Sequence, residues 1–260
     1  MICNLYSILH VVILGLIFGG GDAEVKFINI VGIEGVGHHL IEPLIISTIT
    51  ACHGNQLFGA HIFQSVESTK EMISNCKPND VLFARFSFPA GREHRVVSKP
   101  SDVKQKYKLY DLELKVRHLT AAGVVPKFFY VSRDLYEAIN SHAHFDKSFE
   151  NHTRIMGIYL THILNEFHRV ESIQKGLWRR LDYVDIQKKE NVKSIMTAMV
   201  KFFGWHPADC NMSELIANAT RVVHPPTQRT INEKDLQWVK DHIKVDDRVI
   251  PPLVTLRSTS

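Results

Sequence analysis

The sequence has little net charge and no internal repeats, and both absences narrow the class of protein. Its 31 Lys and Arg side chains stand against 27 Asp and Glu, a net charge of +4 in 260 residues. So small a surplus does not by itself indicate a nucleic-acid-binding surface. The apolar fraction of 45% and charged fraction of 22% exclude a disordered chain, a collagen or a coiled coil as the main state. The length fits one α/β domain, or at most two small ones.

Long apolar runs are also scarce, and one of them opens the chain. Residues 5–18 are nearly all apolar and precede residues 19–23, Gly-Gly-Gly-Asp-Ala, which contain a small-x-small pattern typical of signal-peptidase sites. The run has no Lys or Arg before it and is short for a membrane span of about 20 residues. Residues 1–23 are therefore predicted to be a cleaved signal peptide. An uncleaved type II signal anchor and a buried strand or helix are the alternatives.

Cysteine is rare as well, and it does not decide the compartment. The chain has four cysteines, at Cys3, Cys52, Cys76 and Cys210. Loss of the leader would leave three, enough for one disulfide and one free thiol, although burial explains each equally well. N-glycosylation sequons begin at Asn151, Asn211 and Asn218. Together with an apolar leader they favour a glycoprotein of the secretory pathway, either resident in the Golgi or ER lumen or secreted.

Apolar β-branched runs alternate with amphipathic segments along most of the chain, the pattern of a parallel sheet covered by helices. Strands are predicted at residues 26–31, 80–86, 124–132 and 179–186. Helices are predicted at 38–50, 66–76, 104–122, 134–140, 148–173, 190–203 and 232–242. We therefore expect an α/β three-layer sandwich with a central, mostly parallel sheet over residues 24–245, followed by a loose tail over 246–260. Ligands of such sheets bind at the carboxyl ends of the strands.

A glycine-rich loop follows the first predicted strand, with Gly32, Gly35 and Gly37 just before a predicted helix. The backbone N–H groups of such a loop and the positive end of the helix can bind a phosphate. His38 and His39 stand where the phosphate loops of ATP and GTP enzymes carry Lys and then Ser or Thr, so the usual Mg²⁺ ligand is missing. A tight turn without a ligand is the alternative.

Arg133 comes directly after the third predicted strand, and Ser141 follows eight residues later on the next predicted helix. Arginine supplies a bidentate fork and serine a short donor, so the pair can hold one phosphate from two sides. A local ion pair between Arg133 and Asp134 with a helix cap is the alternative.

Taken together, these motifs resemble those of the sulfotransferases that use 3′-phosphoadenosine 5′-phosphosulfate (PAPS). In that family a loop after the first strand holds the 5′-phosphosulfate, and an Arg-Asp pair with a Ser eight residues beyond the Arg holds the 3′-phosphate. Residues 178–205 are similar to a third family motif, with Val184 in place of a Glu. The resemblance covers about residues 25–205 and implies a P-loop topology with PAPS as the cofactor. The cofactor-binding residues it implies are Gly35, Val36, Gly37, His38, His39, Arg133 and Ser141.

The sequence departs from the family pattern at the loop and at the catalytic base. No Lys or Arg lies in the first loop before His38, so His38 or His39 would supply the missing donor. Cytosolic relatives carry their base, a His, just after the second strand, where this chain has Ser87. Glu93 and His94 stand close by, and we expect a catalytic group among them and His38. Arg85, Arg92 or Arg95 could hold an anionic acceptor. A solvated loop without a catalytic role is the alternative for this stretch.

The sequence thus predicts a sulfotransferase that modifies a hydroxyl of a glycan or protein acceptor, with no nucleic-acid partner and no membrane contact beyond an uncleaved leader. The main alternative is a P-loop protein that binds a nucleotide or a sulfated ligand without catalysis. A His-rich metallohydrolase is a further alternative, because His142, His144 and Asp146 match the His-x-His-x-Asp pattern of zinc hydrolases. The further His of those enzymes is missing, and no metal site is predicted. A small-molecule kinase would need the Mg²⁺ ligand that His39 replaces.

Overall fold

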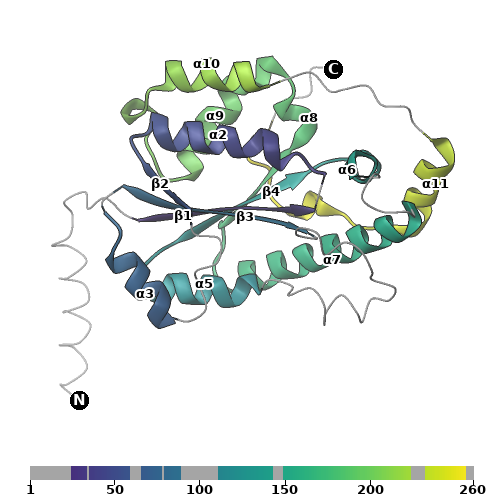
Figure 1. The fold of residues 1–260 in the computed structure, drawn as a ribbon, viewed down its shortest axis with the longest axis horizontal. Helices are drawn as coiled ribbons and strands as arrows, with labels where there is room; N and C mark the ends of the chain where they lie inside the picture. Colours follow the sequence, from purple (N-terminus) through teal and green to yellow (C-terminus); the bar gives the residue numbers. More distant parts are fainter. Residues whose placement is uncertain are drawn as a thin grey trace.

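The computed structural model describes residues 25–33, 35–58, 66–77, 79–88, 111–142, 149–223 and 232–255. Within them the chain forms a five-stranded, all-parallel sheet with the order β2-β3-β1-β4-β5. Helices cover both faces of this sheet, with α2, α9 and α10 on one side and α3, α5 and α7 on the other (Figure 1). The prediction of an α/β fold with a parallel sheet is confirmed, and the layers are compatible with a three-layer sandwich.

The strands and helices have the following bounds. The strands are β1 (Lys26–Ile33), β2 (Asn55–Phe58), β3 (Asp80–Phe88), β4 (Pro126–Ser132) and β5 (Trp178–Asp182). The helices are α2 (His38–Ala51), α3 (Val66–Ser74), α5 (Leu112–Ala121), α6 (Leu135–His142), α7 (Phe149–Ile173), α8 (Tyr183–Ile186), α9 (Val192–Phe202), α10 (Met212–Val222) and α11 (Glu233–His242). Short 3₁₀ turns occupy η2 (Lys189–Asn191), η3 (Pro207–Asp209) and η4 (Asp247–Val249).

Strand β1 forms the centre of the core. It pairs with β3 on one side and β4 on the other, and every residue from Phe27 to Ile33 is buried. A strand covered by helices on both faces has no solvent-facing side, so its sequence is a continuous apolar run rather than an alternating one. This explains why the first predicted strand is also the clearest.

The fourth predicted strand is too long. Strand β5 ends at Asp182, and the next four residues form the single-turn helix α8. Val184, whose β-branched side chain favours a strand, is 59% exposed and lies outside the sheet. Local β-propensity therefore marks the start of this strand correctly but not its end.

A disulfide joins Cys52, just after α2, to Cys210, just before α10. The backbone N–H of Asn211 donates to the carbonyl of Ala51 over 2.8 Å beside it. Cys76 is a free cysteine. The bridge spans 158 residues of sequence, and closing so long a loop stabilises a fold by about 4–5 kcal/mol in the chain-entropy account.

Residues 246–255, expected from the sequence to begin a loose tail, lie ordered beside β5. The N–H of Arg180 donates to the carbonyl of Pro251 over 2.7 Å, and the N–H of Leu253 donates back to the carbonyl of Arg180 over 2.8 Å. Ile250 between them is fully buried. Paired backbone and a buried anchor hold this segment against the sheet, which corrects the expectation for these residues.

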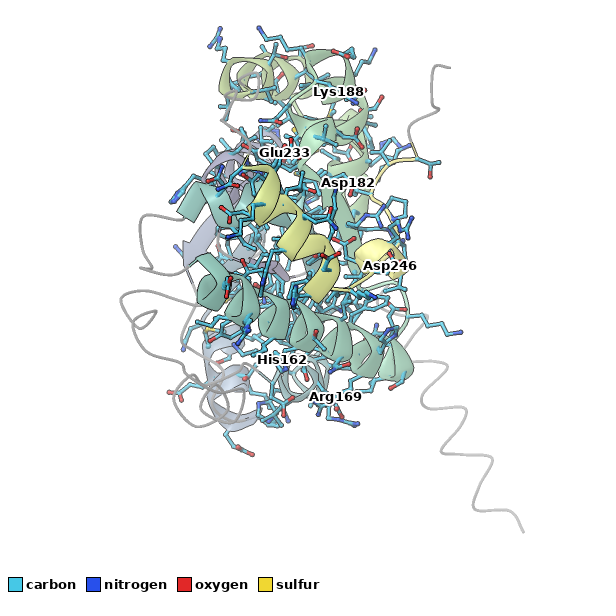
Figure 2. All side chains as sticks on the ribbon, turned by 90° about the vertical axis from the view of Figure 1, so that its right-hand side faces the viewer. His162, Arg169, Asp182, Lys188, Glu233 and Asp246 are labelled. Atoms are coloured by element: carbon cyan, nitrogen blue, oxygen red, sulfur yellow. A yellow bond between two sulfur atoms is a disulfide. The ribbon has the colours of Figure 1, made fainter. Side chains whose placement is uncertain are left out.

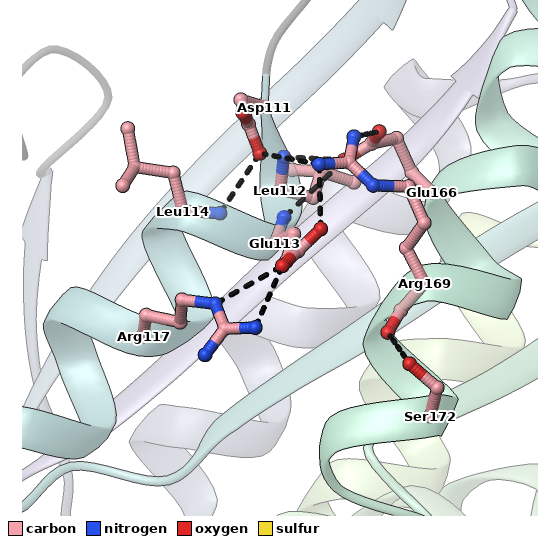
Figure 3. A network of polar contacts seen from close by, with 8 residues as sticks. All are labelled: Asp111, Leu112, Glu113, Leu114, Arg117, Glu166, Arg169 and Ser172. Carbon is pink, nitrogen blue, oxygen red and sulfur yellow. Dashed lines mark hydrogen bonds and ion pairs between the residues drawn. The ribbon is translucent and has the colours of Figure 1, made fainter.

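The start of α5 is fixed by a network of acidic and basic side chains (Figure 3). The buried carboxylate of Glu166, on α7, accepts hydrogen bonds from the N–H groups of Leu112 and Glu113 over 2.8 and 3.2 Å. Arg169 pairs with both Glu166 and Glu113. Glu166 thus supplies the negative charge that a helix N-terminus favours and attaches α5 to α7.

No helix among the described residues has both the length and the apolar character needed to cross a membrane.

Candidate functional site

The strand order predicts a ligand-binding position between the carboxyl ends of β1 and β4. From β1 the chain continues to β2 on one side of the sheet, and from β4 it continues to β5 on the other. In open parallel sheets, ligands bind at such a switch point because the connections diverge there and leave a crevice. Both motifs singled out in the sequence, the glycine loop and Arg133, follow these two strands. Figure 2 looks at the end of the molecule that carries this edge, with Asp182 labelled.

The glycine loop needs its glycines for both conformation and space. Gly35 and Gly37 have φ angles of +86° and +100°, which side chains rarely tolerate. A Cβ on Gly35 would lie 2.1 Å from the carbonyl oxygen of Ala138, on α6. A Cβ on Gly37 would lie 2.1 Å from the ring of Tyr183, at the end of β5. The loop therefore packs directly against the two segments that follow β4 and β5.

The loop leads into α2 without a side-chain cap. Gly37 is the N-cap residue, and its carbonyl accepts from the N–H groups of Leu40 and Ile41 over 2.9 and 3.2 Å. Because glycine has no side chain, position 37 offers no hydroxyl or carboxylate to the first N–H groups of the helix. His38 and His39 supply those first N–H groups. The side chain of His39 is exposed, and Val36 is buried beneath the loop.

Arg133 and Ser141 both donate to the same oxygen of the loop. Arg133 Nη1 lies 2.7 Å from the carbonyl oxygen of Gly35, and Ser141 Oγ lies 3.3 Å from it. The single hydroxyl proton of Ser141 is shared with the carbonyl of Ala138, which lies closer, at 2.7 Å. Residues far apart in sequence, which the family resemblance assigns to one ligand, thus converge on Gly35. We call Gly35, Arg133 and Ser141 the clamp.

The local ion pair expected as an alternative for Arg133 involves a different acid. Arg133 Nε lies 3.3 Å from the carboxylate of Glu137, which is one helical turn away and 59% exposed. Asp134 instead accepts from the N–H of Glu137 over 3.0 Å and so caps α6. An exposed pair of this kind contributes little stability. The contact that buries the guanidinium is the one to Gly35, and the side chain is only 14% exposed.

Tyr183 is a member of this site that the sequence did not single out as a binding residue. The guanidinium of Arg133 lies over its ring, 4.5 Å from the centroid. The same ring contacts Gly37. A cation stacked on an aromatic face is held in position without loss of its N–H donors, which point outward from the guanidinium edge. One signal was available, since Tyr183 directly follows a strand that ends at the same edge.

Arg180 and Asp182, on the strand that precedes Tyr183, balance each other's charge. Arg180 lies 2.9 Å from the carboxylate of Asp182, at the end of β5. Burial raises the pKa of the Asp182 carboxyl above its usual range, and Arg180 opposes that shift. Arg180 therefore forms its ion pair with Asp182. Arg133 instead contacts the carbonyl of Gly35 and the exposed carboxylate of Glu137.

The residues predicted for catalysis lie, in whole or in their side chains, outside the part of the chain that the structure describes. Glu93 and His94 lie outside the described residues, and so do Arg92 and Arg95. The backbone of His38 opens α2, but its side chain lies outside the description, as does that of Arg85. Of the zinc-hydrolase pattern, His144 and Asp146 also lie outside. Among the residues that are described, no three His, Cys, Asp or Glu side chains gather in a way that could hold a metal ion.

Comparison of the chain with protein-family models and with curated proteins finds no match in either.

Proposed function

We propose that this protein is a sulfotransferase of the secretory pathway that uses PAPS and acts on a hydroxyl of a glycan or protein. The observation that carries the proposal is the clamp. Arg133 and Ser141, the two donors that the resemblance assigns to the 3′-phosphate, converge on the loop that it assigns to the 5′-phosphosulfate. The strand order β2-β3-β1-β4-β5, with this loop leading from β1 into α2, supports the finer assignment of a P-loop topology.

We expect both phosphate groups of the nucleotide to bind at this edge of the sheet. At one end, the glycine loop and the uncapped start of α2 offer backbone N–H groups and a positive helix end to the 5′-phosphosulfate. On the β4 side of the same loop, Arg133 and Ser141 both contact one oxygen, the Gly35 carbonyl. A phosphate oxygen would replace this carbonyl as their acceptor, and a charged acceptor strengthens both hydrogen bonds. The Gly35 carbonyl would then have to give up both donors.

The donor molecule supplies an activated sulfo group, whose sulfur forms a bond to the acceptor oxygen as its bond to the bridging phosphate oxygen breaks. The protein's contribution is positive potential placed where negative charge grows on the leaving phosphate, from the N–H groups at the start of α2 and from His38 or His39. A base takes the proton of the acceptor hydroxyl, and Glu93 and His94 are the candidates for it.

The disulfide supports the compartment in this proposal. Cys52 and Cys210 are paired, and structural disulfides form and persist in oxidising compartments such as the ER lumen and the cell exterior. The sulfate acceptors expected there are glycans and proteins that pass through the secretory pathway.

A nucleotide-binding protein without catalysis is the second candidate. The described part of the glycine loop, residues 35–37, reads Gly-Val-Gly and carries no cation. The leaving phosphate would therefore lack the fixed charge that a lysine provides. This observation favours binding without transfer.

Incubation of the purified protein with PAPS labelled in its sulfo group and a panel of glycan and protein acceptors separates the two candidates. A sulfotransferase moves label to at least one acceptor and releases 3′-phosphoadenosine 5′-phosphate (PAP). A binding protein retains the nucleotide and labels none of them. Failure to retain the nucleotide at all would contradict both.

A further inference from the structure

The C-terminal segment 245–255 reaches the same edge of the sheet as the clamp. It is held to β5 through the backbone of Arg180 and through buried Ile250. In Figure 1 its short turn η4 lies between the end of the sheet and α7. Two neighbouring aspartates in this turn have different environments, and the difference indicates a role for one of them.

Asp246 faces solvent and builds the turn. Its carboxylate accepts from the N–H of Arg248 over 3.0 Å and pairs with the Arg248 side chain over 2.8 Å. Both side chains are exposed, and Asp246 is labelled near the outer surface in Figure 2. Such a pair contributes little by itself, but the capped turn directs the next residue, Asp247, toward the sheet.

Asp247 binds the last two residues of β4 that face its side of the sheet. One carboxylate oxygen accepts from Tyr130 Oη over 2.9 Å and from Ser132 Oγ over 2.5 Å. Tyr130 and Ser132 are two positions apart and so lie on one face of the strand. Burial and the Asp247 carboxylate both raise the pKa of the Tyr130 hydroxyl well above its usual value, so Tyr130 remains a donor. Hydrogen bonds to a carboxylate are stronger than neutral ones.

Asp247 also connects β4 to its neighbour. Arg180, on β5, donates from Nη1 to the backbone carbonyl of Asp247 over 3.4 Å. Tyr130 pairs in register with Arg180, and Ser132 with Asp182. The turn thus joins the carboxyl ends of two adjacent strands, and the next residue after Ser132 is Arg133.

We propose that Asp247 is a positioning residue, which fixes the end of β4 so that Arg133 leaves the sheet toward Gly35 and Tyr183. The charge of Asp247 is shared by two hydroxyl donors beside β4, so it can hold the strand end without taking Arg133 as its own partner. The predicted effect on nucleotide affinity rests on the proposed function. The predicted effect on how rigidly Arg133 and Gly35 are held is independent of that function.

The test compares Asp247→Ala and Asp247→Asn with the matched control Asp246→Asn, which changes the neighbouring exposed aspartate and keeps a good capping residue. Amide hydrogen exchange of the ligand-free full chain is measured at 35–41 and 133–141. Affinity for PAP is measured by titration calorimetry. Asp247→Ala should speed exchange in both segments and weaken PAP binding about tenfold, the loss expected for a hydrogen-bonded charge. Asp247→Asn keeps an acceptor oxygen, so its exchange rates and its affinity for PAP should lie close to those of the unaltered protein. The control Asp246→Asn should change neither the exchange rates nor the affinity.

The outcomes separate the two proposals. Faster exchange confined to 245–255, or spread evenly over the chain, shows a purely structural role and overturns the positioning of Arg133. If the unaltered protein does not bind PAP but Asp247→Ala still loosens the clamp, the sulfotransferase proposal fails and the positioning role stands. If PAP binds the unaltered protein and Asp247→Ala equally well, with no change in exchange, the positioning role fails. Should Asp247→Ala not fold, Ser132→Ala removes one of the same hydrogen bonds and gives the same test.

Discussion

Arg133 donates a hydrogen bond to the carbonyl of Gly35 across 98 residues of sequence, at a distance of 2.7 Å. The contact joins the segments that follow β1 and β4 at the point where the connections of the sheet diverge. The hydroxyl of Ser141 lies 3.3 Å from the same oxygen, and the ring of Tyr183 supports the guanidinium. Under the proposed function, an oxygen of the 3′-phosphate would take the place of this carbonyl as the acceptor for Arg133.

Alanine at Gly35 should destabilise the fold and abolish nucleotide binding. The left-handed backbone alone costs a side chain about 1–2 kcal/mol, and the new Cβ would also lie 2.1 Å from the carbonyl oxygen of Ala138. Gly123→Ala is the matched control, because Gly123 has a similar φ of +84° but nothing within 4 Å of its Cβ position. Urea denaturation should give a larger loss for Gly35→Ala. Equal losses would show that the loop does not pack on α6.

Tyr183→Phe should bind PAP as well as the unaltered protein, whereas Tyr183→Ala should bind it more weakly. Phenylalanine keeps the ring face under Arg133 and beside Gly37, and alanine removes it. A stacked cation contributes about 0.5–2 kcal/mol, or roughly a twofold to thirtyfold change in affinity. Titration calorimetry measures both variants. A loss in Tyr183→Phe equal to that in Tyr183→Ala would show that the hydroxyl, not the ring, is what matters.

Removal of the disulfide should lower the free energy of unfolding by about 2–5 kcal/mol. The double variant Cys52→Ala with Cys210→Ala tests this by thermal or urea denaturation under non-reducing conditions. Cys76→Ser is the control, since Cys76 forms no disulfide, and it should change stability by less than about 1 kcal/mol. If the double variant is as stable as the control, the bridge between α2 and α10 is not formed in the protein.

Stability should rise with pH between about 8 and 10.5 because of Lys115. Burial lowers the pKa of this lysine from 10.5 to about 8. In that window the unfolded chain binds more protons than the folded one, so raising the pH favours the folded state. Methionine carries no titratable group, so Lys115→Met should abolish the rise.

Lys193→Met is the control for this measurement, because Lys193 is exposed on α9. It should leave the pH dependence of the melting temperature in place. An unchanged pH profile in Lys115→Met would contradict the assignment of the rise to that lysine.

Strands β1, β3 and β4 could be predicted from the sequence, and their positions in turn predicted where Arg133 and the glycine loop lie. Strands β1, β3 and β4 are buried by helices on both faces, so their apolar runs are unmistakable. Once they are located, Arg133 and the glycine loop must lie at their carboxyl ends. The cap of α11 could also be predicted, and the Asn232 side chain accepts from the N–H groups of Lys234 and Asp235.

Other features depend on contacts that the local sequence does not encode. Strand β2 has only four residues and exists because it pairs with β3. Helix α10 was not predicted, although Asn211 is its capping residue. Asp247 lies 117 residues from Tyr130 in sequence. Its local sequence alone predicts a polar tail. Pairing at long range, not propensity, decides β2 and the position of Asp247, whereas α10 carries a local signal, its cap at Asn211, that the sequence-based prediction missed.

The most direct test of the proposed site compares PAP with 5′-AMP, which lacks the 3′-phosphate, in titration calorimetry. Arg133→Ala is measured beside Arg117→Ala, because both arginines pair with a Glu one helical turn away, but Arg117 lies on α5 among the residues of Figure 3. The account predicts that the unaltered protein and Arg117→Ala bind PAP at least about tenfold more tightly than 5′-AMP, a difference of about 1.4 kcal/mol. Arg133→Ala should lose that preference. Equal affinities for the two nucleotides in the unaltered protein, or a preference that survives in Arg133→Ala, would contradict it.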